Sequence, residues 1–493
     1  MNERERQLIA SVQQRIEKMR NQVQRDPYRL HYHLMPPVGL LNDPNGFVQF
    51  HGEFHIFYQW NPFETTHGAK FWGHYVSADF VAWKEQPIAL APAEDYERNG
   101  CYSGSAVEHL GKLYLFYTGN VKKGTKRETY QCLAVSEDGI HFEKKGPVID
   151  LPEGFTAHFR DPKVWKRGNT WYMVIGAQDK QEQGCVVMYS SADLYNWKYE
   201  KILVGSMRNG LGEFGYMWEC PDLFSINGEE VLIFSPQGIE PKGTYYQNVF
   251  QSGYVLGNLD YEQLQFEHGA FAELDRGFDF YAPQTTEDNQ GRRILVAWMG
   301  ITDEQEQLQP TIKNGWVHAL TIPREIQLRG NKIYQQPVQE LKKLRGHEVA
   351  YAGITINHET KTFAGISGAA LELVIDNMET HEVEEFSITC RNHVEIVYRK
   401  EQHHLTLRRR TFDNQKWEER VCAIDNLRKL QIFLDVSSIE IFVNDGEEVF
   451  TARFFPDPEN KEIVFANKGS VSFDLQKWSL QASGGNEQTT RLK

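Results

Sequence analysis

The sequence predicts an all-β protein: a five-bladed β-propeller followed by a C-terminal β-sandwich, with a short N-terminal helix. Three observations predict this fold: a motif repeated at intervals near 60 residues, a change to alternating strands in the last third of the chain, and one stretch of helical periodicity at its start. The expected divisions are a helical segment over 1–29, the propeller over 30–337, the sandwich over 338–483 and a tail over 484–493.

The repeated motif is a glycine-containing turn followed by an apolar, aromatic-rich strand. A polar residue leads into another strand shortly before each copy, and a third pattern follows three copies, from Ser77, Ser136 and Ser191. About four short strands per repeat correspond to one propeller blade. Because the innermost strands of a propeller surround its axis, the polar residues that open the repeats should converge on one funnel. The copies begin at Gly52, Gly111, Gly168, Gly228 and Gly291, which gives intervals of 59, 57, 60 and 63 residues.

The C-terminal part has a different texture. Runs of alternating apolar and polar residues start at Leu371, Val394, Leu405 and Ser438, and Asn444-Asp445-Gly446 is a strong hairpin signal within the last run. These features predict antiparallel strands in a sandwich. The polar tail over 484–493 is expected to be poorly ordered.

The start of the chain predicts an amphipathic helix. Leu8, Ile9, Val12, Ile16 and Met19 follow helical spacing within a polar segment. The segment lacks the charged n-region followed by an apolar core that a signal peptide needs, and no later stretch approaches 18 consecutive apolar residues. These features predict a cytosolic protein without a membrane partner.

Composition favours a small polar substrate. The chain has 53 Lys and Arg against 67 Asp and Glu, for a net charge of −14, and its basic residues are scattered, which argues against nucleic acid or an anionic membrane as a partner. The 11 Trp and 22 Tyr suit sugar stacking and large β cores equally well.

The six cysteines lack CxxC spacing, so we expect no zinc site, disulfide framework or cofactor. His31 and His33 have metal-ligand spacing without a third ligand, which favours packing or hydrogen bonding.

Seven ordered motifs then resemble glycoside hydrolase family 32. They are HLMPPVGLLNDPNG, FYQWNP, the Trp72-Gly73-His74 stretch, YSGSA, FRDPKVW, MWECPDLF and DFYAPQ. The resemblance covers about residues 31–330 and extends to the C-terminal half, which is similar to the sandwich of that family. It implies a retaining β-fructofuranosidase that acts on sucrose or sucrose 6-phosphate through a covalent fructosyl-enzyme, without cofactor or metal.

Two carboxyl groups with different roles are required for this chemistry, which passes through an oxocarbenium-like transition state. Asp43 is the candidate nucleophile, because the rigid turn at Asn42-Asp43-Pro44-Asn45-Gly46 can hold a carboxylate at the funnel mouth. The alternative is a turn aspartate that caps its own backbone. Glu219 is the candidate acid/base, and its apolar neighbours Trp218 and Cys220 should raise its pKa. The alternative is a surface glutamate at a strand start.

Other site residues follow from the resemblance. Asp161 is similar to the third carboxylate of the family, which hydrogen-bonds fructosyl hydroxyls, and Arg160 is placed to keep it ionised. A structural Arg-Asp salt bridge is the alternative. The Cys220 thiol is expected to shape the surroundings of Glu219. Tyr102 stands where many members of the family carry Phe. The substrate contacts implied are Asn42, Gln59, Trp60, Trp72, Tyr102, Ser103, Arg160, Tyr281 and Trp298.

Several alternatives remain open at this point. The lack of a secretion signal favours an imported disaccharide over levan or inulin, the substrates of fructan-degrading exo-hydrolases. A fructosyltransferase would use the same carboxylates. A sugar-binding propeller without turnover should lack a carboxylate, and none is missing. A substrate phosphate would need a basic residue at the funnel rim, for which Lys313 and Arg208 are candidates. The sequence leaves the oligomeric state open, including a homo-oligomer formed through the sandwich.

Overall fold

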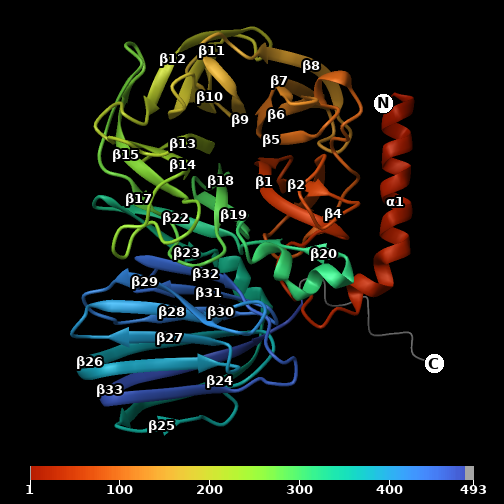
Figure 1. Ribbon diagram of the computed structural model, residues 1–493. Coiled ribbons are helices and arrows are strands. Elements are labelled where there is room, and N and C mark those ends of the chain that lie inside the picture. Colours follow the sequence, from red (N-terminus) through yellow and green to blue (C-terminus); the bar gives the residue numbers. More distant parts are fainter. Residues whose placement is uncertain (1, 483–493) are drawn as a thin grey trace.

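A computed structural model describes residues 2–482 and confirms the all-β fold (Figure 1). Five mainly antiparallel sheets are arranged around an axis, and a two-layered sheet follows them in the chain. The expected tail over 484–493 lies outside the described residues. The boundary that we propose after residue 337 lies between the end of strand β23 and the 3-10 helix η4 (Gln339–Leu344).

Each blade places its first strand next to the axis, so β1, β5, β9, β13 and β18 are neighbours around the centre. Short pieces β17 (Ala272–Glu273), β20 (Trp316–Val317) and β21 (Ala319–Leu320), and the 3-10 helices η1 (Asp95–Glu97), η2 (Glu306–Leu308) and η3 (Pro310–Asn314), lie between the main strands. The blade strands are β1 (Gly39–Phe50), β2 (Glu53–Asn61), β3 (Phe71–Ser77) and β4 (Lys84–Glu85); β5 (Cys101–His109), β6 (Lys112–Lys123), β7 (Lys126–Ser136) and β8 (Glu143–Asp150); β9 (Phe155–Arg167), β10 (Thr170–Asp179), β11 (Gly184–Ser191) and β12 (Trp197–Gly205); β13 (Met217–Ile226), β14 (Glu229–Gln237), β15 (Gly253–Asp260) and β16 (Gln265–His268); β18 (Tyr281–Glu287), β19 (Arg293–Met299), β22 (Arg324–Arg329) and β23 (Lys332–Pro337).

The sequence repeat corresponds to repeated local structure. The glycine that opens each motif turns the first strand of a blade into the second, with φ between 59° and 86°, a backbone conformation that favours glycine. The pattern from Ser77, Ser136 and Ser191 is the turn between the third and fourth strands of the first three blades. In each turn an aspartate two residues later accepts two backbone N–H groups, as Asp193 does from Tyr195 and Asn196 at 2.9 and 2.8 Å.

The N-terminal helix prediction is confirmed by α1 (Glu3–Gln24), which lies along the first blade (Figure 1). Val12 is fully buried, and Leu8, Ile9 and Ile16 pack against the same core. One apolar stripe therefore anchors this helix, as its spacing predicts. Within residues 2–482, no helix is both long enough and apolar enough to span a membrane.

The sandwich forms because two long strands pass through both of its layers. Strand β26 pairs with β30 along its first part and with β27 along its last part, and β33 stays beside it while register shifts bend the pair. The inner faces of both layers share one apolar core. The strands are β24 (Arg345–Asn357), β25 (Thr360–Lys361), β26 (Leu371–Cys390), β27 (Val394–Arg399), β28 (His404–Arg410), β29 (Trp417–Ala423), β30 (Leu430–Leu434), β31 (Ser438–Val443), β32 (Glu448–Arg453) and β33 (Ile463–Leu480).

A buried charge network joins the sandwich to the propeller. The ring nitrogens of His33, which precedes β1, lie 3.0 Å from Asp435 and 3.0 Å from Glu440, both in the sandwich. Arg324 of the fifth blade also pairs with Glu440, at 2.6 Å, and with Asp275 at 3.0 Å. The expectation that His33 serves hydrogen bonding is confirmed.

Candidate active site

The first strands of the blades share an irregularity at the level of the candidate site. The pairing of each first strand with its second strand shifts register at the predicted site residues, in β1, β5, β9, β13 and β18. In β9, β13 and β18 a proline lies within the shift, and in β1 Pro44 ends it; a proline takes no part as a ladder donor. Asp161, Cys220 and Ala282 precede such prolines and have φ of 67°, 49° and 50°. Bulges of this kind re-aim side chains, here toward the axis.

Asp43 is held by donors from three directions. Its carboxylate accepts Asn42 Nδ2 at 3.1 Å, Gln59 Nε2 at 3.2 Å and Ser103 Oγ at 2.5 Å. Burial raises the pKa of Asp43 and the Glu219 charge adds to this, while the bonds from Ser103 and Asn42 oppose it. The carboxylate therefore has a fixed orientation and faces the cavity, as a nucleophile requires.

Glu219 has a different environment from the one expected. Arg160 donates to its Oε1 from Nε at 2.9 Å and from Nη2 at 2.5 Å, and Gln237 and Tyr281 donate to Oε2, each at 2.7 Å. Burial raises the pKa of Glu219, but the Arg160 charge and these bonds outweigh burial and lower it below its ordinary value. The expectation of a raised pKa is wrong, because the apolar neighbours in the sequence do not face this carboxyl group.

Asp161 therefore lacks the partner that the sequence suggested. Arg160 points to Glu219, while the Asp161 carboxylate accepts the backbone N–H of Cys220 at 3.0 Å. Burial raises the pKa of Asp161 against the charge of Arg160, and the charges of Glu219 and Asp43 add to the increase. The prediction that Arg160 keeps Asp161 ionised is wrong, because burial of Asp161 outweighs the charge of Arg160, whose hydrogen bonds go to Glu219.

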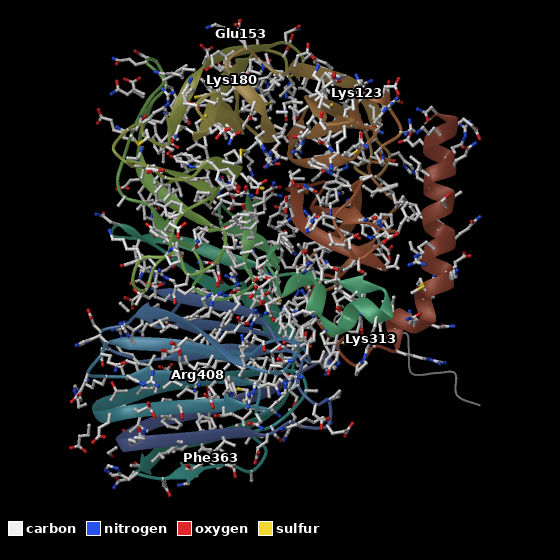
Figure 2. The ribbon with its side chains drawn as sticks, in the orientation of Figure 1. Lys123, Glu153, Lys180, Lys313, Phe363 and Arg408 are labelled. Atoms are coloured by element: carbon white, nitrogen blue, oxygen red, sulfur yellow. The ribbon has the colours of Figure 1, made fainter. Side chains whose placement is uncertain are left out.

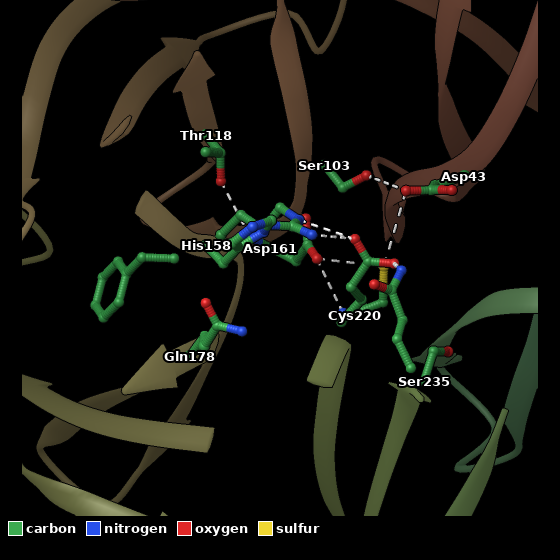
Figure 3. A network of polar contacts seen from close by, with 12 residues as sticks. Asp43, Ser103, Thr118, His158, Asp161, Gln178, Cys220 and Ser235 are labelled. Atoms are coloured by element: carbon green, nitrogen blue, oxygen red, sulfur yellow. Dashed lines mark hydrogen bonds and ion pairs between the residues drawn. The ribbon is translucent and has the colours of Figure 1, made fainter. Parts of the chain in front are cut away.

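Cys220 connects carboxylates of two other blades. Its Sγ lies 3.6 Å from Asp161 Oδ2 and 3.8 Å from Asp43 Oδ2 (Figure 3). Its thiol thus contacts these two groups, whereas the sequence suggested Glu219. Burial raises the pKa of Cys220, and the charges of Asp161 and Asp43 add to this, so the thiol keeps its proton and can donate to either carboxylate.

The remaining predicted residues divide into two groups. Asn42, Gln59, Tyr102, Arg160, Tyr281 and Trp298 line one cavity of about 290 Å³ together with Asp43, Asp161 and Glu219. Ser103 is buried behind Asp43 and acts through it. Asn42 Oδ1 and Trp298 Nε1 are buried without a hydrogen-bond partner among the described residues, so two polar atoms of the cavity walls remain unsatisfied.

Trp60 and Trp72 do not reach the cavity. Trp60 is 2% exposed and donates its indole N–H to Val38 O at 2.6 Å, and Trp72 is fully buried and donates to Tyr102 O at 3.1 Å. Trp60 follows Gln59 on β2, so the two side chains point to opposite faces of the sheet. Trp72 is on β3, farther from the axis. The structure corrects both assignments as substrate contacts.

Sequence reasoning missed several cavity residues. With one exception, these residues lie in or beside the connections that follow the second strand of a blade. The exception is Gln237, the last residue of β14. Those connections are at the same end of the propeller as the starts of the first strands, so the topology could have indicated them. The missed residues are His67, Lys70, Arg127, Gln237, Phe250 and Thr302.

The two basic residues proposed for the rim are not among the residues that line the cavity. Lys313 is in η3, and the main-chain oxygen of that residue accepts a bond from Gln22 of helix α1, away from the funnel (Figure 2). Arg208 pairs with Asp179 at 3.2 Å. Neither lines the cavity, which holds Lys70, Arg127 and Arg160 as its cations. The cavity thus has three carboxyl groups, hydrogen-bonding side chains and aromatic walls, an arrangement that suits acid/base and covalent chemistry on a polyhydroxylated ligand.

Comparison with known proteins agrees with this chemistry. The model described as "Glycosyl hydrolases family 32 N-terminal domain" matches residues 33–337, and "Glycosyl hydrolases family 32 C terminal" matches residues 340–479. The chain is 50% identical over 488 residues to a sucrose-6-phosphate hydrolase of Bacillus subtilis, with 97% of this chain and 100% of that protein covered.

Solved structures give the same picture. A β-fructofuranosidase of Bombyx mori matches with a TM-score of 0.84 and 34% identity, covering 96% of this chain and 98% of that chain. A sucrose-6-phosphate hydrolase from Lactobacillus gasseri matches with a TM-score of 0.85 and 32% identity, covering 96% and 97%.

Proposed function

The chain belongs to glycoside hydrolase family 32, and from this premise we propose that it is a retaining β-fructofuranosidase acting on sucrose or sucrose 6-phosphate. One observation carries the proposal: carboxyl groups of three blades, Asp43, Asp161 and Glu219, line one cavity, and Asp43 is fixed by three donors. The names of the relatives at up to 50% identity support the same substrate class.

In the first step Asp43 attacks the anomeric carbon of the fructosyl unit, and the bond to the leaving hexose breaks. Glu219 gives its proton to the leaving oxygen, so glucose or glucose 6-phosphate leaves with a neutral hydroxyl group at that position. Glu219 is ionised in the free cavity, so it takes this proton from solvent when the substrate binds. The negative charge of the nearby Asp43 repels the Glu219 carboxylate and so favours protonation of Glu219.

In the second step water replaces the enzyme at the anomeric carbon. Esterification has removed the Asp43 charge, so the Arg160 and Tyr281 contacts again favour the Glu219 carboxylate, which accepts the proton of the attacking water. Two displacements at one carbon retain its configuration. Asp161, Asn42 and Trp298 would bind fructosyl hydroxyls.

Initial rates on sucrose, sucrose 6-phosphate, raffinose and inulin test this proposal. We expect fructose release from the first two at higher kcat/KM than from inulin, with β-fructofuranose as the first anomer formed in an NMR time course. Release of the α-anomer would mean inversion, and Asp43 would then be a general base. Oligosaccharide formation exceeding fructose release at high sucrose would indicate a fructosyltransferase.

Two further expectations are part of the proposal. A cytosolic location would give the enzyme access to imported, phosphorylated sugar, and fractionation of cells that make the protein measures it. Self-association through the sandwich is measured by light scattering of the purified protein.

A further inference from the structure

The cavity holds a guanidinium group without an anionic partner. Arg127 lines the cavity from the start of β7, and within residues 2–482 it has no ion pair. Its Nε donates to Oδ1 of the fully buried Asn120 at 2.7 Å, and its Cζ lies 5.4 Å from the ring centroid of Tyr102. These contacts orient the side chain and leave both terminal nitrogens available.

The other cavity arginine is fully engaged. Arg160 uses Nε and Nη2 on Glu219 and Nη1 on His158. Burial lowers the pKa of Arg127, and the charge of Arg160 adds to this. A desolvated cation that repels its neighbour is costly unless an anion joins it.

A second cation faces the same way. Lys122 lies directly opposite Arg127 in the β6–β7 ladder, so their side chains emerge on one face. Like charges at opposed positions destabilise a hairpin. The other lysines of this turn, Lys123 and Lys126, are compensated by Glu128 at 2.8 and 3.6 Å, whereas Lys122 has no ion pair within the described part of the chain. The two cations of the hairpin without an ion pair, Lys122 and Arg127, therefore lie on the same face, and Arg127 lines the cavity from that face.

The location relative to the acid/base decides which part of a substrate meets these cations. Arg127 lines the cavity from β7, which contacts the strand β9 that carries Arg160, the partner of Glu219. The charges of Glu219 and Asp161 both act on Arg127, whereas the charge of Lys70 acts on Asp43. Glu219 protonates the oxygen of the departing hexose, so that hexose occupies the side of Arg127. This step rests on the proposed function.

We propose that Arg127, assisted by Lys122, binds a phosphate monoester carried by the leaving hexose. The planar guanidinium matches a phosphate through two parallel bonds, and the flexible ammonium of Lys122 adds a point charge at the rim. The pair sets the preference for the phosphorylated disaccharide over the neutral one. It also makes the released hexose phosphate an inhibitor.

Kinetics with matched substrates test this site. The ratio of kcat/KM for sucrose 6-phosphate to kcat/KM for sucrose should fall about 10- to 100-fold in Arg127→Gln, as expected for loss of a charge-assisted bond. Lys122→Gln should lower the ratio less, and Arg127→Lys should restore part of it. Glucose 6-phosphate should inhibit the wild-type enzyme more strongly than glucose, and Arg127→Gln should remove the difference. Arg208→Gln and Lys313→Gln are the controls, and their ratio should equal that of the wild type.

The outcomes separate this site from the proposed function. If Arg127→Gln, with a wild-type melting temperature, slows both substrates equally, the phosphate site is refuted and the β-fructofuranosidase stands. If the wild-type protein releases fructose from neither substrate, the function fails, and calorimetric binding of glucose 6-phosphate against glucose decides the site alone. Equal inhibition by inorganic phosphate and glucose 6-phosphate would refute recognition of a hexose. If Arg127→Gln does not fold, Lys122→Gln and the inhibition of wild type by the two hexoses decide.

Discussion

At the scale of single residues, the ionisation of the carboxyl groups follows from which side chain each one contacts. Arg160 is next to Asp161 in the chain, yet both nitrogens that pair with a carboxylate reach Glu219, 59 residues away. Glu219 thus has the lowered pKa, and Asp161 and Asp43 have raised ones. In the free enzyme the acid/base is the better stabilised anion, so its donors control how easily it takes a proton.

A change at Tyr281 tests whether the hydrogen-bond donors of Glu219 set its pKa. Tyr281→Phe removes a bond to Glu219 that favours the carboxylate, so the pKa of Glu219 should rise. The first step needs protonated Glu219, and its rate is lost as pH rises through that pKa. The basic limb of the pH profile of kcat/KM should therefore move to higher pH. Tyr254→Phe, which removes a hydroxyl outside the cavity, is the control. A limb that stays in place or moves to lower pH refutes the assignment.

Chemical rescue separates the two carboxylates. Glu219→Ala should lose about 10²- to 10⁴-fold in rate on sucrose, but a substrate with an activated leaving group should still form the fructosyl-enzyme, which azide then attacks. Asp43→Ala cannot form that intermediate from either substrate. Asp161→Asn should slow all substrates together, through weaker stabilisation of the fructosyl cation. Rescue of Asp43→Ala but not of Glu219→Ala, measured as fructosyl azide, would reverse the roles.

At the scale of secondary structure elements, the sequence predicted what is local. The glycine turns and apolar strands recur within each repeat, so the five blades could be counted from Gly52 to Gly291. The register shifts could not be read, because they depend on pairing between strands. This is why Asp43, Asp161 and Glu219 could be placed at the funnel while their hydrogen-bond partners could not.

Gln284 shows how the blades are tied below the site. It lies next to the register shift of β18, accepts Phe47 N–H of the first blade at 2.8 Å and donates to Gly104 O of the second blade at 2.9 Å. Gln284→Ala leaves both buried backbone groups unsatisfied. We expect a loss of about 1–3 kcal/mol of unfolding free energy per group, measured by urea denaturation. Gln265→Ala, on an exposed edge, should change stability little. Equal stability of the two variants would contradict a tie at the axis.

At the scale of the whole molecule, the sandwich covers the propeller through an interface that is both apolar and charged. Alternate residues of β30 and β31 face opposite ways: Ile432 and Ile441 enter the sandwich core, whereas Phe433 and Phe442 pack with the propeller. The His33 network lies in this interface, buried completely. Nothing in the repeat indicated that a histidine before the first blade meets carboxylates from the second part of the chain.

The ionisation of this network predicts how stability depends on pH. His33 faces Asp435 and Glu440, and Glu440 also pairs with Arg324. Burial lowers the pKa of His33, but bonds and charges from both carboxylates outweigh it and raise the pKa above the ordinary value. A raised histidine pKa stabilises the folded protein fully below the ordinary histidine pKa, and this contribution is lost as pH rises through the folded value.

Melting temperature should therefore fall more steeply on the alkaline side in the wild type than in His33→Gln, which cannot titrate there. His381→Gln, which removes an exposed histidine paired at 3.6 Å with Glu379, should keep the wild-type slope. Parallel pH profiles of wild type and His33→Gln would show that the network keeps the same charge in folded and unfolded chains, and would refute its role as a pH-dependent link between propeller and sandwich.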